Sequence, residues 1–376
     1  MRHVNTFGAF LRRILKRIFD GIISRLPPPL VSRSCEQLLR VASKNDRFFH
    51  MMDSLPKGSD PARYGLTDPV TPEPPGRIAV VIQGPVLGTD DFTLETVRLY
   101  RHVCPDMTVI LSTWDNSPVE IIQRCREAGA DVVLSRLPAG SGRGNVNYQA
   151  TSARAGIQRA GELGAQFVAK TRSDQRLYGV HCLYGLPALL AAFPTKPGSD
   201  QVARLVTSTF HTFKYLPLVA CDHFMFGAVP DMLAFWSPPI DTLNRSQKEI
   251  NRESLLQTTV EGKSRDFVER YLMTEFLRKK NEHPAYTILA WWRVLADRFM
   301  VIEWSQLDAY WPKYCPIVAR RDVHMNVMIS WVRFSFADWV RLVSTDPSDW
   351  RPPEQLLDLP PDTAPPVRLC ELPQSG

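Results

Sequence analysis

Paired cysteines are missing from this sequence. Its seven cysteines are odd in number and scattered, and no two of them form a C-x-x-C pair. A disulfide framework would need an even set at short spacings, and a cysteine-rich zinc site would need close pairs. We therefore expect neither a disulfide framework nor a zinc site, and a reducing compartment such as the cytosol is favoured.

Long apolar runs are missing as well. No run approaches the roughly 20 apolar residues that a helix needs to span a bilayer. There is also no long uninterrupted apolar segment of the kind found in signal peptides. Neither a transmembrane span nor a cleaved signal peptide is expected.

Most of the chain carries little net charge. The formal net charge is +6, and residues 1–26 contribute +5 of it through six basic side chains and one acidic side chain. The rest of the chain is therefore close to neutral. A nucleic-acid surface needs basic residues spread over a face of the folded domain, so no nucleic-acid partner is expected.

The basic N-terminal segment has an apolar side. Apolar residues repeat at spacings of three and four along residues 1–26, the basic residues fall mainly opposite them, and the pattern stops at Pro27. We interpret residues 1–29 as a basic amphipathic helix, lying in the plane of an anionic membrane surface that it contacts through residues 1–26. The alternative is a helix that packs on its own domain or on a partner chain.

The remaining chain divides by composition. Residues 30–76 combine a possible helix with a Pro-rich linker, and residues 344–376 form a Pro-rich tail that we expect to be disordered. Between them, residues 77–343 have the composition of one globular domain.

Three short apolar runs open this domain. They lie at residues 77–86, 107–114 and 131–135, and helix-like segments separate them. Alternating strands and helices predict an α/β fold, in which a parallel sheet with right-handed crossovers is covered on both faces. Ligands of such sheets bind where strands end, so the polar residues after each run are the candidates for a site.

A glycine-rich loop at residues 140–145 precedes the next predicted helix. Exposed backbone N–H groups at a helix N-terminus, together with Arg143, suit a pyrophosphate. The strand that follows runs into Asp174, whose carboxylate can hold a divalent cation that bridges phosphates. Small residues in the helix, Gly156 among them, suit close packing on a sheet.

Five short motifs occur in order within residues 77–230. They are IQGPV, LSTW, N-x-N-x-Q, K-T-R-S-D and DHFMFG. Together they resemble the WavE-type lipopolysaccharide synthesis family and look like those of a GT-A-like glycosyltransferase. The resemblance implies a mostly parallel, Rossmann-like sheet that binds a nucleotide sugar, with helical C-terminal additions.

The resemblance implies a donor site at the strand ends. Its expected members are Gln83, Gly84, Pro85, Thr113, Arg143, Asn145, Asn147, Lys170, Arg172 and Asp174. Asp174 is also the expected ligand of a divalent cation, Mn²⁺ or Mg²⁺. The usual D-x-D pair of GT-A enzymes is here Arg172-Ser173-Asp174, so the metal is an option and not a requirement. Arg172 can bind phosphate directly, and the alternative for Asp174 is an ion pair with Arg172 or Arg176.

Asp222 and His223 interrupt an apolar run at residues 218–229. Such polar groups are either paired within the fold or exposed in a cleft, because burying them without partners is costly. An inverting transferase needs a base for the acceptor hydroxyl, and Asp222 is the first candidate and His223 the second. The alternatives are a capping or donor-site carboxylate for Asp222 and a hydrogen-bonded core histidine for His223.

These observations favour a glycosyltransferase that is peripheral on the cytoplasmic side of the inner membrane. It would move a sugar from a nucleotide-sugar donor to a lipid-linked or lipopolysaccharide glycan, or to another surface glycan. One alternative is a sugar-nucleotide nucleotidyltransferase, although such enzymes usually have a Gly- and Arg-rich loop where this chain has Gln83-Gly84-Pro85. The other is a non-catalytic, membrane-docked scaffold, which the incomplete D-x-D would fit.

Two later segments are interpreted as helices. In residues 265–280 we assign Glu269 and Glu275 to a solvated face. Residues 324–343 are rich in tryptophan and apolar residues, and we prefer a helix that closes the domain core to one at a membrane interface.

Overall fold

The computed structural model describes residues 76–88, 91–243, 267–311 and 332–352. All of them belong to one compact unit, Ser54–Gly376. The amphipathic helix expected at residues 1–29, the helix and linker that follow it up to residue 75, and the tail after residue 352 lie outside the described residues. The predictions for those segments stay predictions.

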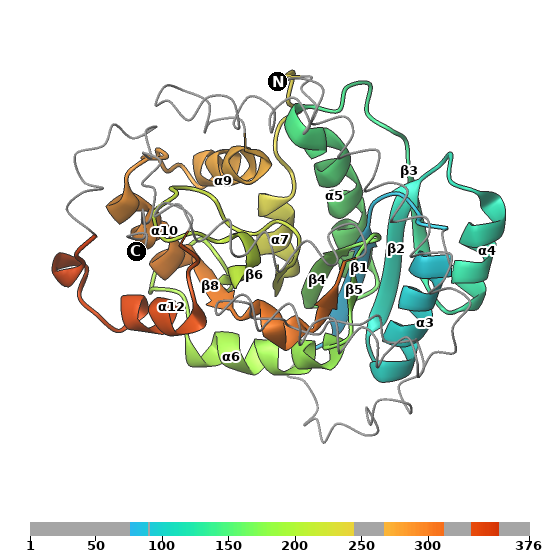
Figure 1. Cartoon of the computed structure of the whole chain (residues 1–376), viewed down its shortest axis with the longest axis horizontal. Helices are drawn as coiled ribbons and strands as arrows, with labels where there is room; N and C mark the ends of the chain where they lie inside the picture. The colour runs from blue at the N-terminus through green and yellow to red at the C-terminus, as the bar shows by residue number, and fades with distance from the viewer. Residues whose placement is uncertain (1–75, 89–90, 244–266, 312–331, 353–376) are drawn as a thin grey trace, which may run out of the picture. The chain divides into compact units, whose positions relative to one another are not determined.

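A seven-stranded sheet forms the centre of this unit, with the strand order β3-β2-β1-β4-β7-β6-β8 (Figure 1). The strands are β1 (Ile78–Gln83), β2 (Thr108–Trp114), β3 (Asp131–Ser135), β4 (Phe167–Arg172), β6 (Leu205–Ser208), β7 (Met225–Ala228) and β8 (Phe299–Ile302). Strands β1 to β4 are parallel to their neighbours in that group, β6 is parallel to β8, and β7 is antiparallel to both β4 and β6. Two short strands, β5 (Arg176–Leu177) and β9 (Ala309–Tyr310), form a separate antiparallel pair. The prediction of an α/β domain with a mostly parallel sheet is confirmed.

The apolar runs form the strands that they predicted. All six residues of β1 are buried, as is typical of a parallel strand covered on both faces. β2 and β3 begin and end within one residue of the second and third runs, and each pairs with its predecessor in parallel. The local pattern was sufficient here because each run is short, β-branched and bounded by polar residues.

Helices cover the sheet. They are α3 (Phe92–Val103), α4 (Val119–Glu127), α5 (Val146–Glu162), α6 (Leu186–Ala192), α7 (Val229–Phe235), α9 (Val268–Lys279), α10 (Ile288–Arg298) and α12 (Phe336–Val343). Figure 1 shows α3 and α4 on one side of β1 and β2 and α5 on the other. A Cβ atom on Gly156 of α5 would lie 2.9 Å from Ser112 Cβ and would also collide with Val81. The small residues of this helix therefore permit the close approach to the sheet that the sequence predicted.

The reversed strand β7 determines which loops meet. Its start lies beside the end of β4, because Lys170 pairs with Met225. The end of β6 lies there too, since Thr207 also pairs with Met225, and β8 ends level with β6, with Ser208 opposite Ile302. We name the edge at which β1, β2, β3, β4, β6 and β8 end and β7 begins the carboxyl edge. Polar residues that follow six strands and precede a seventh come together along it.

Helix α12 closes the core. Trp339 is fully buried, and its indole N–H lies 2.9 Å from the carbonyl oxygen of Phe299 and 3.2 Å from that of Leu295. The helix begins at Phe336, and residues 332–335 of the segment expected to be helical are not part of it. For the helix itself, the preferred interpretation that it closes the core is confirmed. Trp350, which lies within the tail expected from residue 344, is also buried in the core.

Among the described residues, no helix combines the length and hydropathy that crossing a membrane requires.

The four cysteines in the described part of the chain are thiols: Cys104, Cys125, Cys182 and Cys221. Burial raises the pKa of Cys104 and Cys182 to about 12 and that of Cys125 and Cys221 to about 11. Because the thiolate is the nucleophilic and metal-binding form, these side chains act as apolar packing groups.

Candidate functional site

The order in which strands are added to the sheet reverses between β1 and β4. The chain passes from β1 to β2 and β3 on one side of β1, and then returns to β4 on the other side. Because both crossovers are right-handed, α3 and α5 lie on opposite faces of the sheet (Figure 1). Open α/β sheets bind ligands at such a switch point, outside the carboxyl ends of the strands. Here the two strand ends are joined directly: the Ser173 N–H donates to Gln83 O at 2.9 Å, and Ser173 Oγ donates to Pro85 O at 2.6 Å.

Glycine is required beside this junction. Gly84 has a φ of 124°, and a Cβ atom on it would lie 2.8 Å from Ser173 Oγ. The residue therefore lets the chain turn away from β1 while β4 stays close.

Two buried amide side chains lie at the switch point without full hydrogen bonding. Gln83 donates through Nε2 to Ser152 Oγ at 2.8 Å, but its Oε1 has no donor among the described residues. Gln175, directly after Asp174, is fully buried, and neither of its amide atoms has a partner in the described part of the chain. Buried polar groups of this kind mark places where water or a polar ligand binds.

Arg172 and Asp174 form a two-pronged ion pair at the end of β4. Arg172 Nε and Nη2 donate to the two carboxylate oxygens of Asp174 at 2.8 and 3.0 Å. Burial alone would raise the pKa of Asp174, but the hydrogen bonds from Arg172 outweigh it and hold this pKa below its ordinary value. The Arg172 guanidinium also lies over the Trp311 ring, 5.0 Å from its centre. The ion-pair alternative for Asp174 is thus realised with Arg172, and a cation on Asp174 would have to open that pair.

The loop before α5 is organised by a carboxylate from elsewhere in the chain. Arg143 N and Nε both donate to Asp241 Oδ2, at 2.7 and 2.9 Å. Asn147 donates to Asp241 O at 2.8 Å and accepts from the Asp241 N–H at 2.8 Å. The Asp241 carboxylate therefore lies where the sequence suggested a phosphate, beside the start of α5. Of the expected donor residues in this loop, Asn145 is the exposed one, in the left-handed conformation with a φ of 68°.

Two further expected donor residues lie inside the protein. Thr113 is fully buried in β2, with its hydroxyl oxygen 3.1 Å from Ser117 Oγ. Lys170 is fully buried too: its ammonium group donates to Asp222 O at 2.6 Å and lies 4.3 Å from the centre of the Trp236 ring. Burial lowers the pKa of Lys170 to about 8. These contacts make Lys170 a group that positions the segment before β7.

Asp222 and His223 lie beside one another at the start of β7. Asp222 is 3% exposed, and its Oδ1 lies 3.4 Å from His223 Nδ1. The contact is a close electrostatic one and not a hydrogen bond, because Asp222 Oδ1 has no hydrogen-bond donor among the described residues. A small movement of either side chain would let the carboxylate orient the imidazole, as carboxylates do in acid–base and metal sites.

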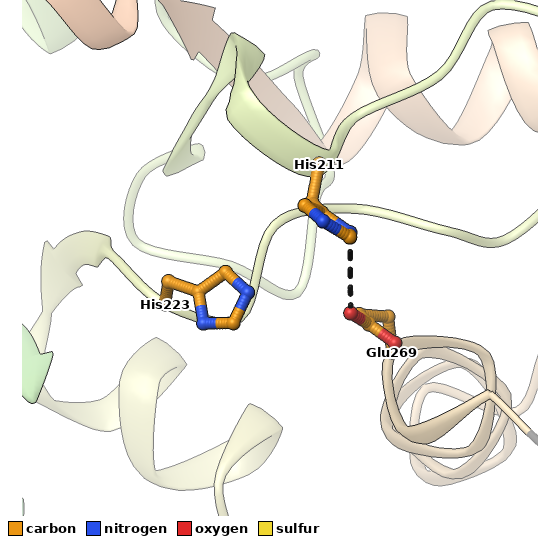
Figure 2. A group of neighbouring side chains, drawn as sticks. All are labelled: His211, His223 and Glu269. Atoms are coloured by element: carbon orange, nitrogen blue, oxygen red, sulfur yellow. Dashed lines mark ion pairs between the residues drawn. The ribbon is translucent and has the colours of Figure 1, made fainter. Parts of the chain in front are cut away.

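His211 and Glu269 join His223 from two other segments. His211 ends the short helix η5 (Thr209–His211) that follows β6, and Glu269 lies in the first turn of α9. Figure 2 shows Glu269 and His211 facing each other, with the His223 ring to one side. His211 Nδ1 lies 3.6 Å from Glu269 Oε1. Burial, and after it the nearby Asp222 carboxylate, raise the pKa of Glu269 well above its ordinary value.

The sequence analysis overlooked His211 and assigned Glu269 to a solvated face. His211 comes directly after a predicted strand, so the rule that polar residues at strand ends are site candidates would have found it. Glu269 carries no such local signal, because its neighbours His211 and Asp222 belong to the connection between β6 and β7. Its side chain is 12% exposed beside His211. Glu275, whose side chain is also 12% exposed, pairs with Arg278, so the expectation of a solvated face is wrong for both glutamates.

Comparison with known proteins identifies the family. A family model described as WavE lipopolysaccharide synthesis matches residues 78–314. No curated protein matches this chain. The matched residues cover more than half of the chain, all seven strands of the main sheet, and the site described above. The resemblance read from the motifs is thus confirmed, and the chain belongs to the WavE lipopolysaccharide synthesis family and has a role in lipopolysaccharide synthesis.

Proposed function

We propose that this chain is a glycosyltransferase with a GT-A-like donor site, which moves a sugar from a nucleotide sugar to a lipopolysaccharide or other surface-glycan acceptor. The observation that supports it most is the position of the Arg172–Asp174 pair at the switch point, next to Asp222 and His223. Open α/β sheets bind nucleotides at such points. Membership of a lipopolysaccharide synthesis family supports a glycan acceptor.

On the donor side, Arg172 is the group proposed to hold the diphosphate. Asp174 takes the Nε–Nη2 edge of the Arg172 guanidinium, so the Nη1–Nη2 edge is the one that would pair with two phosphate oxygens, and the group stays charged at physiological pH. When the bond between the anomeric carbon and the diphosphate breaks, its electron pair goes to the phosphate oxygen, and Arg172 stabilises the charge that develops there. Asp174 orients Arg172 through two hydrogen bonds. The buried amides of Gln83 and Gln175 offer hydrogen bonds to the nucleoside.

On the acceptor side, a hydroxyl oxygen of the glycan attacks the anomeric carbon and must lose its proton. The Asp222–His223 pair is the proposed proton acceptor, since a carboxylate next to an imidazole suits general-base work.

A divalent cation on Asp174, Mn²⁺ or Mg²⁺, is the remaining part of this proposal. Such an ion would add positive charge beside the leaving diphosphate. Both Asp174 oxygens accept hydrogen bonds from Arg172, and the motif has no second carboxylate. The residues present therefore fit charge neutralisation by Arg172 better than by a cation on Asp174.

Binding of a nucleotide sugar is the direct test. The full chain should melt at a higher temperature with one nucleoside diphosphate and its sugar conjugate than without ligand, because a ligand that binds only the folded state adds about 2.7 kcal/mol at 100 times its Kd. The panel is measured with and without Mg²⁺ or Mn²⁺, and the Arg172→Ala variant should lose the shift. Pyrophosphate release from a nucleoside triphosphate would instead indicate a nucleotidyltransferase. No shift from any nucleotide would favour the scaffold.

The N-terminal segment is proposed to hold the enzyme on the inner membrane, where a lipid-linked acceptor is synthesised. Deleting residues 1–29 should move the protein from the membrane pellet to the soluble fraction, because the apolar stripe and the basic side chains act together at an anionic surface. Changing Arg12, Arg13, Lys16 and Arg17 to glutamine tests the charge contribution separately. An unchanged distribution of the deletion variant would refute the proposal.

A further inference from the structure

Three side chains that can ligate a metal meet at the carboxyl edge, and none of them belongs to the Arg172–Asp174 pair. They are His211 after β6, His223 before β7 and Glu269 in α9, and their ligand atoms all lie within 4.8 Å of one another (Figure 2). His211 and His223 lie 12 residues apart, near the two ends of the connection between β6 and β7, and the packing of α9 brings Glu269 to them.

The spacing fits one ion with small adjustments. Ligands bound to one ion at about 2.0–2.2 Å lie about 3.0–3.5 Å apart. His211 Nδ1 and Glu269 Oε1 are already 3.6 Å apart. The widest separation, at most 4.8 Å, closes when side chains move by roughly 1 Å.

The surroundings resemble those of bound metal ions. Ligating histidines commonly have their other ring nitrogen next to a carboxylate, which fixes the ring. Asp222 lies in that position, 3.4 Å from His223 Nδ1, and its Oδ1 is buried without a hydrogen-bond donor in the described part of the chain. Aromatic rings restrict both histidines: the Trp311 ring centre lies 4.6 Å from that of His223, and the Phe210 ring centre 5.0 Å from that of His211.

Access also suits a cation. The side chains of His211, His223 and Glu269 are 23%, 14% and 12% exposed. An ion can therefore reach the cluster from solvent while most of its surroundings are protein.

We infer that His211, His223 and Glu269 bind one divalent first-row transition ion, of the class of Zn²⁺, Co²⁺ or Mn²⁺, with Asp222 as the residue that positions His223. Two imidazoles and one carboxylate favour such ions over Mg²⁺ and Ca²⁺, which prefer oxygen ligands. With the ion bound, His223 is a ligand and Asp222 remains as the proton acceptor of the pair. The inference does not rest on the proposed transfer reaction, because ion binding is measurable without donor or acceptor.

The experiment uses the full chain stripped with a chelator. Titration with Zn²⁺ by calorimetry and with Co²⁺ by visible absorption should show one ion bound per chain, with no competition from equimolar Mg²⁺. His211→Ala, His223→Ala and Glu269→Gln should each weaken binding at least about 10-fold, and Asp222→Asn should weaken it about 10-fold or more through loss of orientation. The matched control is His102→Ala, an exposed histidine on α3, which should bind as the unchanged protein does.

Two results would overturn the inference. One is that the unchanged protein binds neither Zn²⁺ nor Co²⁺ more tightly than the His211→Ala variant does. The other is that Asp174→Asn, and none of the three ligand variants, removes the ion. Nucleotide binding without added metal is measured on the same preparations, so failure of the ion site and failure of the proposed function are distinguishable.

A second measurement needs no variant and covers the case in which a substitution unfolds the protein. Zn²⁺ should protect His211 and His223 from acylation by diethyl pyrocarbonate, as read by mass spectrometry of the peptides, while His102 reacts at the same rate with or without Zn²⁺. Equal reaction of all three histidines with and without the ion would contradict the site.

Discussion

Replacing Arg172 with alanine is expected to lower sugar transfer by about 10²–10³-fold, the usual cost of removing one preorganised group that stabilises transition-state charge. Arg172 lies at the end of β4, at the switch point, with its fork held by both oxygens of Asp174. The loss should appear in KM for the donor as well as in kcat, because Arg172 holds the diphosphate of the bound donor and the charge on that group is greatest in the transition state. Steady-state kinetics with a saturating acceptor measures it.

The chain offers a matched control for this variant. Arg159 makes the same two-pronged contact with Asp131, at 3.0 and 2.9 Å, but Asp131 starts β3 and therefore lies at the opposite edge of the sheet. Arg159→Ala should leave kcat unchanged. Equal losses in Arg159→Ala and Arg172→Ala would show that the effect comes from the fold and would remove Arg172 from the mechanism. Asp174→Asn should reduce transfer as well, because it weakens the orientation of Arg172.

Replacing Trp339 with alanine is expected to lower the free energy of unfolding by about 3–5 kcal/mol, the typical cost of removing a large buried aromatic side chain. Trp339 is fully buried between α10 and β8, and its indole N–H is within hydrogen-bond range of two carbonyl oxygens, those of Leu295 and Phe299. The cavity and the lost hydrogen bonds both contribute. Urea denaturation at constant m-value measures the loss.

Two further variants separate the contributions to this loss. Trp339→Phe keeps most of the ring but removes the donor, so it should cost about 1–3 kcal/mol, the range for leaving a buried polar group unpaired. Trp292→Ala is the matched control, since Trp292 also donates to a carbonyl, that of Lys214, but is only half-buried. It should cost less than Trp339→Ala. If Trp339→Ala cost no more than the control, α12 would not be part of the core.

The parallel half of the fold was readable from the sequence because its signals are local. Each of the first three strands is a short β-branched run bounded by polar residues, and the helices between them repeat apolar residues at helical spacing. The position of Asp174 after β4 followed from the same pattern. These features depend on neighbours within a few residues, which is what periodicity can detect.

The half around β6, β7 and β8 was less readable because its organisation is non-local. Whether Asp222 and His223 lie at the same edge as Asp174 depends on β7 running antiparallel to β4, and no local pattern states the direction of a strand. Glu269 looks like any acidic residue on a helix until α9 packs beside His211. The absence of close cysteine pairs argued against a zinc site, but it could not detect a pair of histidines brought together by tertiary structure.

The loop before α5 binds an anion, as the sequence indicated, but the anion is not the expected phosphate. The sequence indicated an anion site there, with Arg143 and backbone N–H groups as donors. The structure supplies the anion from within, as the Asp241 carboxylate. The local sequence shows the hydrogen-bond donors of such a site, but it does not show which distant residue accepts those hydrogen bonds.

The reversed direction of β7 also determines which changes the segment between β6 and β7 can accept. Residues 209–224 leave and rejoin the sheet at the same edge, so no crossover helix limits their length. The segment nevertheless carries His211, Asp222 and His223, and most of its side chains are buried. An insertion or deletion there would displace all three groups together, so relatives that keep them are expected to differ at its part-exposed positions, such as Tyr215.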